Sequence, residues 1–153
     1  MAQRKRAAPR TAEGDAMFDV VVEAFATTFR LRAAGREVGA VTGQGGLWGL
    51  LRSLDIEGPQ TVPQLARSRP VARQHIQKLA DKLAADGLIE FVDNPAHRRS
   101  KLLRLTKKGA AVYAALTDRI QDMTEDLAQG MNAGEVRTAA RVLRAIRERL
   151  ASQ

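Results

Sequence analysis

The chain of 153 residues contains no cysteine, which excludes disulfide bridges, thiolate zinc sites and thiol redox chemistry. Only two histidines are present and they are far apart, so no metal site is expected. Aromatic residues are also scarce, with one Trp, one Tyr and four Phe. The core must therefore consist mainly of aliphatic side chains and alanine, which suits packed helices better than a β-sandwich. We expect a mainly α protein.

Long uncharged hydrophobic runs are missing as well. The longest apolar stretch, FDVVVEAFA from Phe18, is interrupted by Asp19 and Glu23 and is far shorter than the ~18 residues of a membrane span. The basic start MAQRKRAAPR is not followed by the apolar segment of a signal peptide. We therefore expect a soluble, cytoplasmic protein without a membrane partner.

Motifs for catalysis are not found in the sequence. It has no nucleophile elbow, and GQGG from Gly43 is not followed by the Lys and Ser/Thr of a phosphate-binding loop. Neither enzymatic activity nor a cofactor is expected.

A local excess of positive charge is the first feature that indicates a function. The formal net charge is +8, and residues 67–108 carry eleven basic and four acidic residues. Residues 1–10 add four basic residues and no acid, which we interpret as a disordered arm or a solubilising extension. Clustered Lys and Arg supply the main affinity for duplex DNA, and a solvated basic face is the competing interpretation.

The basic segment overlaps Thr61–Thr106, whose sequence pattern indicates two short helices followed by a β-hairpin. Thr61 and Gln64 form a capping box at the start of the first helix, and Ala72–Asp86 is the second helix, ended by Gly87. The β-rich runs LIEFVD and SKLLRLT are joined by NPAHRR, whose Asn-Pro marks a turn. This order predicts a winged helix-turn-helix, a DNA-reading unit.

Polar and basic side chains of the second helix and the hairpin tip are the candidate DNA contacts. One helix face, with Ile76, Leu79 and Leu83, can pack inwards, which leaves the other for the major groove. The hairpin tip can reach the minor groove or the flanking backbone. The candidates are Arg73, Gln74, His75, Gln77 and Lys78 on the helix and His97, Arg98, Arg99 and Lys101 on the hairpin. Ordinary solvated side chains are the competing interpretation.

The segment VARQHIQKLADKLAADGLIEFVDNPAHRRSKLLRLTKKG resembles the winged helix of the MarR family of bacterial regulators. The resemblance rests on a recognition helix, a turn after GLI, a wing ending in an Arg pair, and Leu105 and Thr106 followed after two residues by Gly109. It covers about residues 45–110. It implies a dimeric transcription factor, usually a repressor, and many such proteins release DNA on binding small, often phenolic, molecules.

Two positions depart from the family pattern. Ala72 stands where a capping Ser is usual, which weakens the start of the recognition helix by about 0.5–2 kcal/mol. His97 replaces the acid that commonly precedes the Arg pair, and offers a weak, pH-sensitive phosphate contact in place of the usual bracing.

Helices at about residues 15–34 and 107–151 flank the winged helix, which we place at about residues 45–106. The last helix repeats apolar residues at spacings of 3, 4, 3 and 4. Such stripes more often belong to the core of their own chain, but the winged helix needs little extra cover, so we expect the helices to pair two copies. The expected dimerisation residues are Phe18, Val22, Val136, Ala139, Leu143, Ile146 and Leu150.

The expected fold is mainly α with a small β-hairpin wing (α+β), in one domain at residues 13–153 after a disordered tail at 1–12. Phe25, Phe29 and Trp48 are candidates for an effector pocket, although apolar residues at such positions more often belong to the core. The expected function is a homodimeric regulator that binds an inverted repeat in double-stranded DNA and responds to a small apolar or phenolic effector. The alternative is a protein-interaction or architectural DNA-binding module without an effector.

Overall fold

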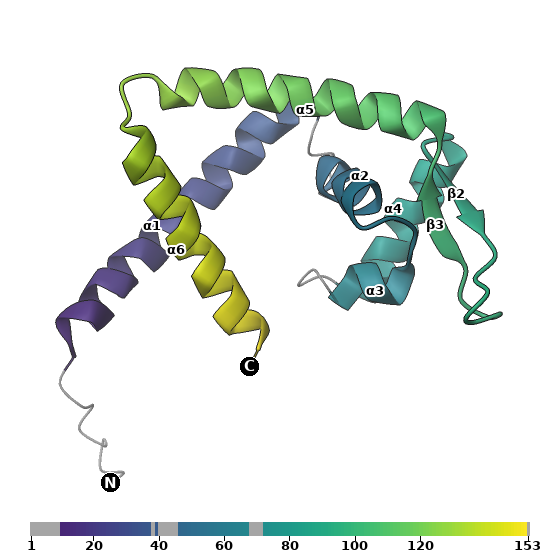
Figure 1. Ribbon diagram of the computed structural model, residues 1–153, viewed down its shortest axis with the longest axis horizontal. Coiled ribbons are helices and arrows are strands. Elements are labelled where there is room, and N and C mark those ends of the chain that lie inside the picture. The colour runs from purple at the N-terminus through teal and green to yellow at the C-terminus, as the bar shows by residue number, and fades with distance from the viewer. Residues whose placement is uncertain (1–9, 38, 40–45, 68–71, 153) are drawn as a thin grey trace, which may run out of the picture.

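The computed structural model describes residues 10–37, 39, 46–67 and 72–152. Its elements are, in order, α1 (Ala12–Glu37), α2 (Leu47–Ile56), β1 (Gln60–Thr61), α3 (Val62–Arg67), α4 (Arg73–Ala85), β2 (Ile89–Val92), β3 (Leu102–Leu105), α5 (Lys107–Ala128) and α6 (Ala133–Ala151). The mainly α fold with a small antiparallel sheet confirms the prediction. In Figure 1 the winged helix gathers below one end of α5, and α6 runs from the other end. Residues 1–9 of the predicted tail lie outside the described residues.

An aliphatic core holds the winged helix together. The buried side chains come from α2, α3, α4 and the hairpin, and they are Leu50, Leu51, Leu54, Val62, Leu65, Ile76, Leu79, Ala80, Leu83, Leu88, Ile89 and Leu103. Each fully buried aliphatic side chain contributes roughly 1.5–3 kcal/mol relative to an exposed one. The core therefore fixes how α4 is rotated, and with it which side chains α4 presents to solvent.

The ends of α3 and α4 follow the predicted capping pattern. The Thr61 amide donates to Gln64 Oε1 at 2.7 Å, and the Gln64 amide donates to Thr61 Oγ1 at 3.3 Å, which confirms the capping box. Gly87 follows α4 with a φ of 72°, the left-handed conformation that favours glycine after a helix. Ala72 precedes α4 without a side-chain cap, as its sequence implies.

The sequence pattern did not predict β1. Gln60 pairs with Leu103 and Thr61 with Leu102, so the sheet has three strands in the order β1-β3-β2 and is not only a hairpin. Two residues are too short to show the alternation of a strand. This strand forms because β3 offers it a free edge, which is a tertiary effect.

α1 is longer than the predicted helix at 15–34. It begins at Ala12, the last residue of the predicted tail, and it continues past residue 34 through Gly35 to Glu37. Alanine favours the helix, and Gly35 is buried in the structure although glycine is a poor helix former. Tertiary packing at the C-terminal end of α1 therefore overrides the local signal.

Candidate nucleic-acid interface

α4 presents opposite faces to the core and to solvent. Ile76 and Leu79 are buried, whereas Arg73, Gln74, Gln77 and Lys78 are exposed, as the spacing predicted; His75 is half-buried. The side-chain amide of Gln77 donates to Asp81 Oδ1 at 2.8 Å, which orients Gln77 along the helix. The helix thus displays amides and cations near its N-terminus, the groups that read base edges and phosphates in a major groove.

Two successive turns shape the tip of the wing. Asn94 Oδ1 accepts from the Ala96 amide at 3.0 Å, and the Asn94 carbonyl accepts from the His97 amide at 3.1 Å. The Ser100 amide then donates to the His97 carbonyl at 3.0 Å. These turns leave four predicted contacts exposed: His97, Arg98, Arg99 and Lys101.

The recognition helix and the wing meet around one hollow of about 230 Å³. Its lining residues come from α3, α4, β2 and the wing: Val62, Pro63, Arg73, Gln77, Phe91, Arg99, Ser100 and Lys101. Three cations, Arg73, Arg99 and Lys101, therefore border this small cavity. Residues that are about 25 positions apart in sequence form one basic surface, which is suited to a phosphate of the DNA backbone.

Two other cations of the basic segment have structural partners. Arg104 Nε and Nη2 donate to Glu90 Oε1 at 3.0 and 2.9 Å across the β2–β3 pair. Lys108 Nζ donates to the Asp86 carbonyl oxygen at 2.7 Å, beyond the end of α4. The excess charge of the segment is therefore not uniformly available to DNA, a distinction that sequence counting missed.

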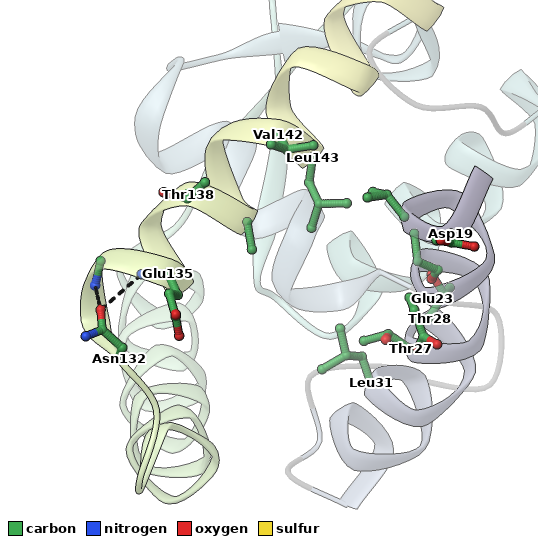
Figure 2. A pocket seen from close by; sticks show the side chains of 14 residues that line it. Asp19, Glu23, Thr27, Thr28, Leu31, Asn132, Glu135, Thr138, Val142 and Leu143 are labelled. Carbon is green, nitrogen blue, oxygen red and sulfur yellow. Dashed lines mark hydrogen bonds between the residues drawn. The ribbon is translucent and has the colours of Figure 1, made fainter. Parts of the chain in front are cut away.

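The predicted dimerisation stripes do not form a core within one chain. α6 contains no buried residue, and Phe18, Leu143 and Leu150 are 59%, 47% and 65% exposed. Val22, Val136 and Ala139 are also exposed, and Ile146 is half-buried. An open groove of about 880 Å³ lies between α1 and α6, and Figure 2 shows the side chains that line it. Leu143 lines this groove, whereas Phe18 and Val22 are not among its lining residues.

The predicted effector residues are not brought together. Trp48 borders a cavity of about 380 Å³ between α1, α2 and α5, with Thr28, Leu31, Arg32, Gly35, Gly46, Gly49, Ile120 and Met123. Trp48 Nε1 donates to Thr117 Oγ1 at 3.0 Å, which joins α2 to α5. Phe25 and Phe29 do not line this cavity; they are 67% and 72% exposed, so they belong neither to the cavity nor to a core within the chain.

Comparison with known proteins assigns the family. A family model described as MarR family matches residues 46–100. The uncharacterized protein Rv2011c of Mycobacterium tuberculosis is 34% identical over 130 residues, which cover 85% of this chain and 91% of that protein. The multiple antibiotic resistance protein MarR of Salmonella typhimurium is 31% identical over 98 residues, which cover 63% of this chain and 68% of that protein. The chain belongs to the MarR family.

The fold agrees with MarR-family membership over nearly the whole chain. The crystal structure of the MarR family transcription regulator SP03579 superposes with a TM-score of 0.73 at 24% identity, covering 92% of this chain and 93% of that one. MarR-family proteins are DNA-binding transcription regulators and not enzymes, in agreement with the sequence. Within the described part of the chain, no helix has the length and apolar character needed to cross a membrane.

Proposed function

We propose that this MarR-family regulator is a homodimeric repressor that reads an inverted-repeat operator with α4 and the wing. The observation that carries the proposal is the hollow at which Arg73 and Gln77 of α4 lie beside Arg99 and Lys101 of the wing. A helix that reads bases and a wing that holds the backbone are thus placed for simultaneous contact with one duplex. The repressor role follows the usual behaviour that the resemblance implies.

The homodimer is supported by the exposed apolar residues of α1 and α6. Monomeric soluble proteins rarely expose large contiguous apolar surfaces. A symmetric dimer would cover these residues and relate two recognition helices by a two-fold axis, with half-sites ~34–36 Å apart. Selection of bound genomic fragments followed by footprinting tests this proposal, because a regulator protects an inverted repeat. An architectural module would protect DNA without sequence preference, and a protein-interaction module would protect none.

Gln74→Ala is expected to weaken operator binding by roughly 1–3 kcal/mol and to leave non-specific binding nearly unchanged, because an amide on this helix reads base edges. Arg99→Ala is expected to weaken binding to both DNAs and to lower the magnitude of the salt slope by about one unit, because a phosphate contact releases a counterion. Both effects are measured by titrating labelled operator and random duplexes at several salt concentrations.

Arg104→Ala is the matched control for Arg99→Ala, since Arg104 lies on the same hairpin but pairs with Glu90. Its salt slope should equal that of the wild type. Equal losses on the two DNAs for Gln74→Ala would refute base reading by Gln74. If Arg99→Ala leaves the salt dependence of DNA binding unchanged, the wing does not contact the DNA backbone as proposed.

We further propose that the cavity beside Trp48 admits a small aromatic effector that releases the operator. Its lining is largely apolar, and Arg32 supplies one cation. Trp48 is the only tryptophan in the chain, so its emission should change when phenol or benzoate binds. Arg32→Ala is expected to weaken benzoate binding roughly 10- to 100-fold and phenol binding much less, because a carboxylate loses a charged partner.

Arg30→Ala is the control for this titration, because Arg30 is exposed on α1 and does not line the cavity. Its affinity for both compounds should match the wild type. Emission that stays constant with both compounds up to millimolar concentration, together with an operator complex that they do not disturb, would count against this class of effector.

A further inference from the structure

The N-terminal half of α1 is an unbalanced acidic surface. Residues 12–23 contain four acidic and no basic residues. Asp15, Asp19 and Glu23 follow each other at intervals of four, so they lie on one face of the helix, where like charges destabilise each other. Asp19 and Glu23 also line the groove between α1 and α6, whose lining residues include no Lys or Arg (Figure 2).

The C-terminal half of α6 has the opposite imbalance. Residues 141–151 contain four arginines and one glutamate, and all five are exposed. Helix dipoles explain the charges in the terminal turns, which are Glu13 and Asp15 in α1 and Arg149 in α6. They do not explain Asp19, Glu23, Arg144 or Arg147, which lie further inside the helices.

The acidic half of α1 and the basic half of α6 do not neutralise each other within one chain. No ion pair between α1 and α6 is found among the described residues; Arg104 and Glu90 form an ion pair on the hairpin. In Figure 1 the N-terminal end of α1 and the C-terminal end of α6 lie well apart, on either side of the point where the helices overlap in the view. Both surfaces therefore remain available to another molecule.

We propose that the occupant is a second copy of this chain, with the basic half of each α6 lying against the acidic half of the partner's α1. The inference rests on the proposed homodimer and adds to it which surfaces meet. One copy carries both complementary surfaces, so a two-fold axis forms the contact twice. Leu143 and Ile146 belong to the apolar stripe of expected dimerisation residues on α6, which we call the seam. They alternate with Arg144 and Arg147 along the helix, so the apolar contact and the charge contact are continuous. Charge pairing at the edge of such an interface selects the correct partner.

Reciprocal charge reversal tests the pairing. The variants Asp19→Lys/Glu23→Lys and Arg144→Glu/Arg147→Glu should each place like charges together and raise the dimer dissociation constant by roughly 10- to 100-fold. An equimolar mixture of the two variants should form mixed dimers of near wild-type stability, because both contacts in the mixed dimer join opposite charges. Native mass spectrometry with one variant carrying a mass tag distinguishes mixed dimers from homodimers.

Two further proteins control for folding and for net charge. The fourfold variant, with both pairs reversed in one chain, should be dimeric again. Asp55→Lys/Glu57→Lys makes the same charge change as the α1 variant at exposed positions near the end of α2 and should dimerise like the wild type. If the wild type is dimeric and the charge variants are equally dimeric, the proposed charge pairing is wrong but the homodimer stands. The same holds if the two variants show no preference for mixed dimers. A monomeric wild type would overturn the homodimer as well.

Discussion

Leu143→Glu combined with Ile146→Glu is expected to separate the proposed dimer and to weaken operator binding by roughly two orders of magnitude or more. Both residues are among the expected dimerisation residues of α6, and the proposed dimer would bury two carboxylates per copy in this apolar contact. Burial of an unpaired charge is strongly unfavourable, so the monomer becomes the stable form. A monomer carries one recognition helix and loses the second half-site.

Light scattering gives the mass of each protein, and an operator titration gives the affinity. Arg137→Glu is the matched control, because it changes the charge of α6 by the same amount at one exposed position outside residues 141–151 and outside the expected dimerisation residues. The control should remain dimeric. A seam variant that is folded by circular dichroism, still dimeric and still bound to the operator would show that the seam does not join the copies.

Gly109→Ala is expected to destabilise the protein by roughly 3 kcal/mol, since a Cβ here would overlap the Leu88 carbonyl oxygen and lie 2.9 Å from its carbon. This carbonyl also accepts from the Thr106 amide at 3.1 Å and from Thr106 Oγ1 at 3.2 Å. The start of α5 is thereby held against the beginning of the hairpin, and neither backbone can move away without losing these bonds. For a chain of this size, the midpoint of thermal unfolding should fall by ~6–12 °C.

Gly14→Ala provides the comparison for this substitution. Gly14 is also in a helix, but its Cβ would have Thr11 Oγ1 as its nearest neighbour, at an ordinary distance of 3.4 Å. Alanine should therefore stabilise α1 by about 0.5–1 kcal/mol. If Gly109→Ala unfolds at the wild-type temperature, the two backbones do not approach each other as closely in solution.

The local elements could be predicted because their signals lie within a few residues. The capping box of Thr61 and Gln64 and the turn at Gly87 follow from hydrogen-bonding groups and backbone freedom at those positions. The burial of Ile76, Leu79 and Leu83 follows from helical spacing, and it leaves the polar face of α4 to solvent. The candidate DNA contacts could therefore be named from the sequence.

Contacts between distant segments were decided only by the tertiary structure. β1 exists because the edge of β3 is available to Gln60 and Thr61, and α1 continues past Ala34 because Gly35 is buried there. Packing also separates Trp48, which lines a cavity, from Phe25 and Phe29, which are exposed. The sequence determined which faces of the helices are apolar and which segment is basic, because these properties repeat along one chain. Whether an apolar face is buried within the chain or left for a partner depends on which elements meet in space, and local spacing carries no information about that.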